Sequence, residues 1–351
     1  MSEAPLIQET ASGLYCEAGD FYIDPWRRVA KAVITHAHAD HARPGSQAYL
    51  ASHEGLRVLR SRLGPSAKID TLPYGQSRLI NGVRVSLHPA GHVLGSAQVR
   101  VEYRGEVWVI SGDYKIEGDA TCTAFEPVRC HTFITESTFG LPIYRWTPQS
   151  EIFRDINEWW IRCRNAGQPA VIFAYSLGKA QRVLAGVNPG IGPIFCHSAV
   201  EELNREYRAS GISLPPTFLV SQAPARKSWE GVLVVAPPAA ANSPWMSRFS
   251  SGSTAMVSGW MLTKATRRWQ SVDRGFPLSD HADWPGLLYA IEETGAEQIL
   301  VTHGHTEPMV RYLTEQGKSA RTIRTQFSEA AEVEQPALSE PVAGVDDGQA
   351  S

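Results

Sequence analysis

Three histidines and an aspartate lie within six residues near the start of this 351-residue chain. Residues 36–41 read His-Ala-His-Ala-Asp-His and follow a short β-branched run at residues 31–35. In extended backbone His36 and His38 point to the same side, because side chains alternate along a strand. Asp40 and His41 come where the chain must turn, so they can face a second ion. Imidazole with carboxylate suits Zn²⁺, Mn²⁺ or iron rather than Ca²⁺, and the segment therefore predicts a metal site.

Two further segments offer the same kind of ligand after or between expected strands. His92 lies in an Ala-Gly-His-Val-Leu-Gly loop, and Asp113 ends a Ser-Gly-Asp turn that follows the apolar residues 107–110. Loops at strand ends are where folds present functional side chains. Each segment alone is weak, since a single loop histidine is commonly solvated and Ser-Gly-Asp is a common turn. Together with residues 36–41, both are expected to be ligands.

These segments together resemble the metallo-β-lactamase superfamily in its binuclear form. The resemblance implies a four-layer αββα sandwich, an α/β fold. It divides the ligands between two divalent ions, Zn²⁺ or Mn²⁺. His36, His38 and His92 would hold one ion, Asp40 and His41 the other, and Asp113 would bridge them, with His303 as the last ligand. Asp24, after Phe-Tyr-Ile, matches an early aspartate that supports a ligand histidine from outside the ligand set. Asp20 lies nearby and is the alternative.

The later part of the chain resembles the β-CASP nucleases of that superfamily, which narrows the function because the fold alone does not identify the substrate. Glu136 in Thr-Glu-Ser-Thr-Phe-Gly looks like their acidic motif A, and His281 in Ser-Asp-His-Ala-Asp like motif B. His303 in Thr-His-Gly-His looks like motif C, with His305 as its competitor. Ala-Tyr-Ser-Leu-Gly-Lys-Ala-Gln, which contains Lys179, resembles another run of that family.

The organisation of the chain follows from its rhythm of strands and helices. The first part predicts strands, including a hairpin at residues 99–110. From about residue 150, strands and helices alternate, which indicates a parallel α/β unit. We expect a metallo-β-lactamase domain at residues 1–145, an inserted α/β β-CASP domain at 146–268 and a return to the first domain at 269–327. Residues 328–351 carry six acidic and no basic residues and predict a disordered acidic tail.

Composition excludes several classes of protein. Hydrophobic residues make up 43% and charged residues 20% of the chain, as in ordinary globular proteins. No apolar run is long enough to span a bilayer, and the first residues have no signal-peptide pattern. Five scattered cysteines argue for a reducing cytoplasm rather than a disulfide framework. Without its tail the chain has a net charge of +3, which permits a polyanionic substrate.

The expected chemistry is two-metal hydrolysis of phosphodiesters, with His281, Glu136 and Asp40 as catalytic residues. His281 is the candidate general acid or phosphate contact. Glu136 would orient His281 and raise its pKa. Lys179, at a predicted helix N-terminus, is expected to hold a phosphate of the nucleic acid.

The chain is compact, and it contains Thr-His-Ala-His-Ala-Asp-His-Ala-Arg at residues 35–43, Ser-Gly-Trp-Met at 258–261 and Phe-Pro-Leu-Ser-Asp-His-Ala-Asp at 276–283. In these features it most resembles, among β-CASP proteins, the bacterial ligase-associated DNA exonucleases. That resemblance implies DNA as substrate, repair of DNA as context, and an ATP-dependent DNA ligase and a helicase in the same pathway. An RNA-processing nuclease shares every motif above and stays the main alternative. A non-catalytic nucleic-acid-binding subunit is disfavoured because none of the seven expected ligands is substituted. A small-molecule hydrolase is disfavoured by Glu136 and His281.

Overall fold

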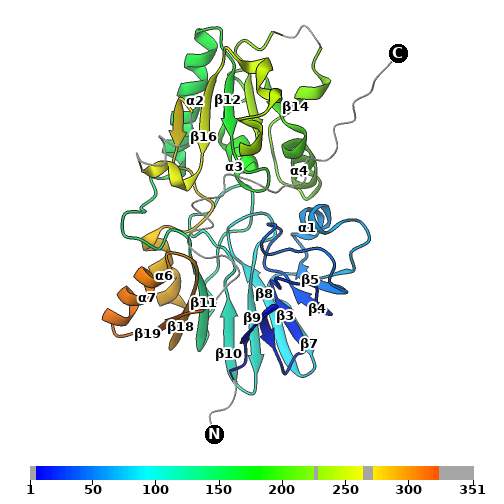
Figure 1. Cartoon of the computed structure of the whole chain (residues 1–351), viewed down its shortest axis with the longest axis vertical. Helices are drawn as coiled ribbons and strands as arrows, with labels where there is room; N and C mark the ends of the chain where they lie inside the picture. Colours follow the sequence, from blue (N-terminus) through cyan, green and yellow to red (C-terminus); the bar gives the residue numbers. More distant parts are fainter. Residues whose placement is uncertain (1–4, 225–227, 264–271, 324–351) are drawn as a thin grey trace.

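The computed structural model describes residues 5–224, 228–263 and 272–323. It contains three sheets, two in one half of the molecule and the third in the other half (Figure 1). The chain builds most of the first half, crosses to the second at about residue 150, and returns after strand β17 (Arg274–Phe276), as Figure 1 shows. The expected acidic tail lies outside the described residues. The mixed α/β class is confirmed.

The first two sheets belong to the half that contains both ends of the described chain. One has the order β1-β2-β3-β4-β5-β6 and the other β19-β18-β11-β10-β9-β8-β7. The strands of the first sheet are β1 (Gln8–Thr10), β2 (Gly13–Cys16), β3 (Phe21–Ile23), β4 (Lys31–Val33), β5 (Ala48–Ser52) and β6 (Ile69–Leu72). Those of the second are β7 (Ser77–Ile80), β8 (Val83–Pro89), β9 (Ala97–Tyr103), β10 (Glu106–Ile110), β11 (Thr132–Ser137), β18 (Gln298–Gly304) and β19 (Ser319–Thr322).

These two sheets pack face to face, and helices cover their outer faces. The core between the sheets joins residues such as Val33 and Leu50 to Val85 and Val99. Helix α1 (Leu56–Leu63) covers the first sheet. Helices α6 (Trp284–Thr294) and α7 (Thr306–Glu315) cover the second. The layer order is thus helix, sheet, sheet, helix. Its assignment to the metallo-β-lactamase architecture stays a proposal.

The third sheet is parallel throughout, in the order β14-β13-β15-β12-β16-β17. Its strands are β12 (Ala170–Phe173), β13 (Ile194–Cys196), β14 (Phe218–Leu219), β15 (Leu233–Ala236), β16 (Ser253–Val257) and β17 (Arg274–Phe276). Helices α2 (Gln149–Asn165), α3 (Lys179–Gly186) and α4 (Ser198–Ala209) contribute to a core with one face of the sheet. Short 3₁₀ turns at Val220–Gln222, Pro238–Ala240, Pro244–Phe249 and Gly259–Leu262 supply residues to the other core.

Most elements expected from periodicity are present, with shifted ends. The hairpin is confirmed as antiparallel β9 and β10, and the alternation after residue 150 as helices α2, α3 and α4 between strands of the parallel third sheet. The helix N-terminus predicted at Lys179 is the start of α3, which follows Gly178 with its φ of +86°. Helices α1 and α7 were not expected. None of the helices among the described residues is long and apolar enough to cross a membrane.

Candidate metal centre

The predicted site residues gather at one edge of the two facing sheets. Parallel strands β10, β11 and β18 end at this edge. Asp113 follows β10, Glu136 lies near the end of β11 and His303 near the end of β18, so these three residues come together. The loop between β8 and β9 turns at the same edge, because β9 is antiparallel to both β10 and β8 and therefore begins where β8 and β10 end. This loop contributes His92. His36 follows β4 of the first sheet.

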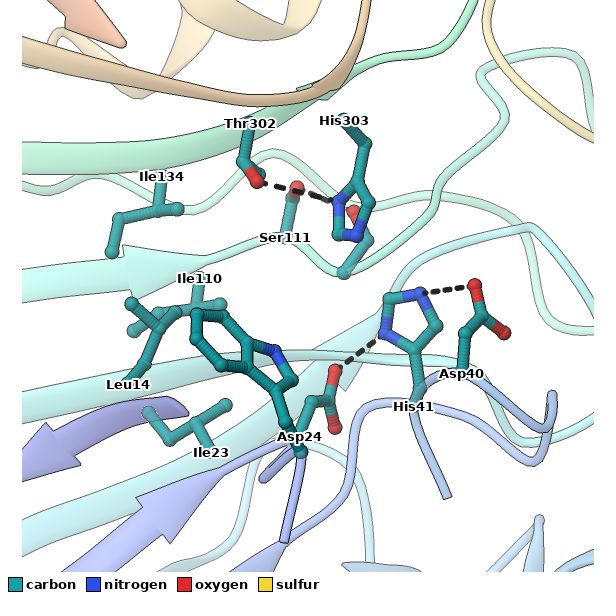
Figure 2. Close-up of a pocket in the computed structure, with 12 residues that line it drawn as sticks. Leu14, Ile23, Asp24, Asp40, His41, Ile110, Ser111, Ile134, Thr302 and His303 are labelled. Carbon is teal, nitrogen blue, oxygen red and sulfur yellow. Dashed lines mark hydrogen bonds and ion pairs between the residues drawn. The ribbon is translucent and has the colours of Figure 1, made fainter. Parts of the chain in front are cut away.

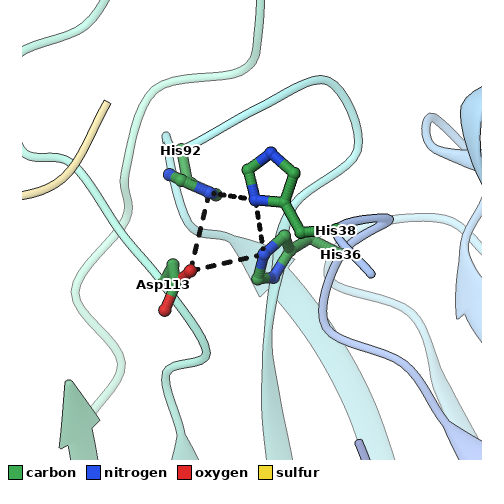
Figure 3. Close-up of side chains that lie close together, drawn as sticks. All are labelled: His36, His38, His92 and Asp113. Atoms are coloured by element: carbon green, nitrogen blue, oxygen red, sulfur yellow. Dashed lines mark hydrogen bonds and ion pairs between the residues drawn. The ribbon is translucent and has the colours of Figure 1, made fainter. Parts of the chain in front are cut away.

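Three histidines and Asp113 form the tightest cluster (Figure 3). Nδ1 of His38 lies 3.1 Å from Nε2 of His36 and 3.0 Å from Nε2 of His92. Oδ2 of Asp113 lies 3.4 Å from Nε2 of His36 and 3.7 Å from Nε2 of His92. We call these four residues the three-histidine group. Their facing atoms all lie within 4.8 Å of one another, as the ligands of a single ion would.

The second ring nitrogen of each histidine in this group has its own partner. Nδ1 of His92 donates to the carbonyl oxygen of Asp280 at 2.8 Å, and Nε2 of His38 donates to that of Leu177 at 3.3 Å. Nδ1 of His36 lies 3.1 Å from Oγ1 of Thr35. A neutral imidazole that donates through one nitrogen offers a lone pair at the other. The three lone pairs therefore face inward, as metal ligation requires.

Burial keeps the rings of His38 and His92 neutral. Desolvation and then the neighbouring His36 lower the pKa of His38 to about 4. Desolvation and then His281 hold the pKa of His92 well below its usual value. Burial opposes ionisation of Asp113, but His41 and His36 outweigh it and hold the pKa of that carboxyl well below its usual value. Neutral imidazoles beside a carboxylate are the protonation states that bind metal.

Asp113 is brought in by a close approach of two loops. A Cβ on the preceding Gly112 would lie 2.6 Å from Cβ of Thr35, and the φ of Gly112 is +56°. Only glycine fits such an approach without strain. This turn places Asp113 between His36 and His41, whose Nε2 atom lies 3.6 Å from Oδ2 of Asp113. Asp113 thus contacts both parts of the predicted ligand set.

Asp40, His41 and His303 form the other part, which we call the aspartate group (Figure 2). Nε2 of His41 lies 3.5 Å from Oδ2 of Asp40. The centres of the His41 and His303 rings are 5.4 Å apart. Burial opposes protonation of His41, but Asp40, Asp113 and Asp24 outweigh it and raise its pKa well above the usual value. A site that attracts a proton this strongly also suits a cation in its place.

Asp24 supports His41 from behind (Figure 2). Its Oδ2 accepts from Nδ1 of His41 at 2.7 Å and from Oγ1 of Thr35 at 2.5 Å, and its Oδ1 accepts from the Thr35 amide at 2.8 Å. Asp24 has a φ of +44°, a conformation that aspartate tolerates better than most residues. The competing Asp20 pairs with Lys31 at the surface instead.

His303 rather than His305 faces the aspartate group. His303 has a φ of +53°, and the hydroxyl of Ser137 donates to its carbonyl oxygen. This constrained backbone turns its ring toward His41, as strained residues at functional sites commonly do. The ring of His305 stacks on Tyr144, with ring centres 6.1 Å apart.

His281 and Glu136 form a buried pair beside the three-histidine group. Nδ1 of His281 donates to Oε2 of Glu136 at 2.9 Å, and Oε1 of Glu136 accepts from the Tyr114 amide at 2.8 Å. The rings of His281 and His92 lie 4.6 Å apart. Burial opposes the charge on His281, but the Glu136 carboxylate and its hydrogen bond outweigh it and raise the pKa of His281 to about 10.

Lys179 lies near the predicted site but not at its surface. Its Nζ atom pairs with Oδ1 of Asp280 at 2.8 Å, and its side chain is 6% exposed. The ammonium thus has an internal partner, and its contact with phosphate stays a prediction. The sequence does not predict that Asp280 binds Lys179 and His92, or that Arg182 binds the backbone of Ser279 and His92. No spacing in the sequence indicates the contacts of Arg182, because its partners are far away along the chain.

The donor set fits divalent cations of the zinc or manganese type. The described residues bring imidazole nitrogens and carboxylate oxygens together, with the rings held from behind. Borderline cations such as Zn²⁺ and Mn²⁺ accept this mixture, whereas Ca²⁺ prefers oxygen ligands alone. Number and identity of the ions are addressed below as a proposal.

Comparison with known proteins finds relatives whose names describe enzymes that act on nucleic acids. No family model matches the chain. A protein named "Probable DNA ligase" from Opitutus terrae is 31% identical over 314 residues, which are 89% of this chain and 30% of that protein. Proteins named "Endoribonuclease YSH1" from Gibberella zeae and Saccharomyces cerevisiae are 27% and 29% identical over 44% and 37% of this chain, and 19% and 17% of their own lengths. The chain thus spans less than a third of these relatives.

These relatives support the metallo-β-lactamase superfamily and its β-CASP nuclease branch. Among solved structures, a protein of unknown function from Enterococcus faecalis V583 has a TM-score of 0.57 at 11% identity, over 84% of this chain and 79% of its own. That likeness concerns the fold alone.

Proposed function

We propose that this chain is a DNA nuclease, with an exonuclease as the favoured mode, that hydrolyses phosphodiester bonds with two divalent cations. The observation that carries the proposal is the convergence of the three-histidine group and the aspartate group on Asp113, beside the His281–Glu136 pair. Phosphodiester hydrolysis needs positive charge next to the phosphate and a proton donor for the departing oxygen. The described residues supply ligands for the first and a candidate for the second.

The chain's ligands divide between two cations. The three-histidine group would hold one cation and the aspartate group the other, with Asp113 shared. Two divalent cations would supply an activated water and offset negative charge on the reacting phosphate. Asp24 keeps the proton of His41 on Nδ1 and so leaves Nε2 available as a ligand.

His281 is the proposed general acid. Its Nδ1 proton is held by Glu136, and the raised pKa keeps a second proton on Nε2 at neutral pH. In the reaction that proton would pass to the leaving oxygen as its bond to phosphorus breaks. The oxygen of water would form the new bond to phosphorus, and the water would release one proton to the solvent. Glu136 would act as a positioning residue that fixes the ring and stabilises its charged form.

DNA is favoured over RNA by the extent of the match. The relative with a ligase name matches 89% of the chain, whereas the endoribonucleases match 44% or less. The ligase name of that relative supports a DNA ligase as a partner. The family resemblance adds that the ligase is ATP-dependent, that a helicase works with it and that the context is DNA repair. RNA is the second candidate substrate, because the other relatives are named as endoribonucleases.

A cleavage assay tests the proposal. DNA strands labelled at the 5′ or the 3′ end, and RNA of the same sequence, are incubated with the wild type in Mn²⁺ or Zn²⁺. Asp40→Ala and His281→Ala serve as matched variants. We expect stepwise shortening of DNA by the wild type and its loss in both variants. Intact DNA in every ion would contradict the proposal, and cleavage of RNA alone would replace DNA by the second candidate.

A further inference from the structure

A buried arginine of the second half of the molecule reaches the loops of the metal centre. Arg182 lies on α3 and is 1% exposed. Its Nη1 donates to the carbonyl oxygen of Ser279 at 2.9 Å, and its Nη2 donates to that of His92 at 3.0 Å. Nη2 also pairs with the carboxylate of Asp119. A charged group this deep is costly unless its hydrogen bonds are made, so its partners are held firmly.

Each loop that Arg182 binds carries a residue of the site. His92 is itself a predicted ligand. Ser279 precedes Asp280, whose carbonyl oxygen accepts from Nδ1 of His92 at 2.8 Å, and His281, whose amide donates to Oγ of Ser279 at 3.0 Å. One guanidinium therefore fixes the peptide of His92 and the start of the segment that orients its ring.

Other contacts of the same region reach the same group. The carbonyl oxygen of Leu177 accepts from Nε2 of His38. A Cβ on Gly178 would lie 2.3 Å from Cγ1 of Val93, so the start of α3 packs directly on the loop of His92. Lys179 pairs with Asp280 at 2.8 Å. The start of α3 thus closes one side of the three-histidine group.

The aspartate group has a different support. His41 is held by Asp24, and Asp24 by Thr35, all on loops of the first sheet. Arg182 has no contact with these residues among those recorded for the described chain. The two groups share Asp113, and His36 and His41 both lie against the Thr35–Asp24 pair of the first half. His38 and His92 differ from them, because their second ring nitrogens have partners in Leu177 and Asp280.

We propose that Arg182 is a positioning residue that sets the geometry of the three-histidine group, so that one cation site of the two depends on the second half of the molecule. The inference rests on the proposed function, in that it assumes a centre for two cations. Arg182 acts through the backbone of His92 and Ser279 and touches no ligand atom. Its loss should weaken one binding constant and spare the other.

Metal binding to the full chain tests this inference. Metal-stripped wild type, Arg182→Lys and Arg182→Gln are titrated with Zn²⁺ against a chromophoric chelator, and two binding constants are fitted. Lysine keeps the charge but cannot span two carbonyl oxygens and a carboxylate as a planar fork does. Asp24→Asn marks the other site. Arg208→Met is the matched control, since Arg208 also binds a carboxylate (Glu201, 3.0 Å) and a carbonyl oxygen (Pro215, 2.8 Å) in the second half, away from the centre.

We expect Arg182→Lys to weaken one constant by about tenfold, the lower range for loss of an outer contact of a metal ligand. Asp24→Asn should weaken the other constant, and Arg208→Met neither. Unchanged constants in Arg182→Lys, or an equal loss of both, would overturn the inference. A thermal melt confirms folding, and Arg182→Lys decides the question if Arg182→Gln does not fold. A wild type that binds no metal would refute the proposed function, whereas a wild type that binds two ions and cleaves DNA leaves only Arg182 in question.

Discussion

The three-histidine group and the aspartate group share Asp113 and differ in burial and in support. The side chains of His36 and His92 are fully buried, whereas that of Asp40 is 39% exposed. The buried group is closed by Leu177 and Asp280, which lie near the second half of the molecule. Within the Asp40–His41 pair of the aspartate group only the Asp40 side chain is this exposed; His41 is buried, donates to Asp24 at 2.7 Å and lies 3.4 Å from Oγ1 of Thr35. The difference suggests a division of work: one group provides a rigid anchor, and the other faces the side from which water and substrate arrive.

Asp113→Ala should have the largest effect, because it removes the contact that the two groups share. Loss of a bridging carboxylate costs several kcal/mol of transition-state stabilisation, and we expect cleavage of labelled DNA to fall about 1,000-fold or more. Initial rates at saturating metal measure it. A loss below about tenfold would show that the groups work independently and would break the comparison.

His281→Gln should reduce kcat by about 100-fold, within the range for loss of a general acid. Glutamine can still bond to Glu136 but carries no proton of suitable pKa. Metal content should stay as in the wild type, because His281 belongs to neither group. A variant with wild-type kcat, or one that loses a metal ion, would show that His281 has been placed wrongly.

Removal of metal should lower the free energy of unfolding. A ligand at 100 times its Kd stabilises the native state by about 2.7 kcal/mol for each site that it fills. Urea unfolding with a chelator, with Zn²⁺ and with Mn²⁺ measures the difference. A sample with Mg²⁺ in place of Zn²⁺ serves as the control, because Mg²⁺ binds imidazole more weakly. Equal stability in all samples would contradict a preformed centre for these ions.

Asp24→Asn should have the smallest of these effects, a weakening of metal binding by about tenfold at one site. The amide can still accept from Thr35 but no longer offers a charge to His41. The chelator titration described above measures both constants, and the three-histidine constant should not change. A loss at both sites would mean that the two groups are not supported separately.

The sequence predicted the ligands that are close together along the chain, and the resemblance extended them to distant ones. His36, His38, Asp40 and His41 could be read from spacing alone, because a strand followed by a turn determines where they point. Spacing does not decide between Asp24 and Asp20, or between His303 and His305, and the resemblance supplied the choice of Asp24 and His303. The structure places Asp24 against His41 and His303 beside it.

The support of the centre could not be predicted in this way. Arg182 bonds to residues 90 and 97 positions away, and backbone carbonyl groups leave no mark in the sequence. Lys179 is the reverse case. Its position in the sequence predicts a contact with phosphate, whereas in the structure its ammonium group pairs with Asp280. Charges inside a fold are decided by which segments meet, and periodicity does not contain that information.

The most direct test of the account is a titration in which metal-free protein receives Zn²⁺ or Mn²⁺ while bound metal and DNA cleavage are measured in the same samples. The account predicts no cleavage without metal and a rise to full activity as bound metal approaches two ions per chain. Cleavage by the metal-free protein, or protein that binds neither ion, would contradict it.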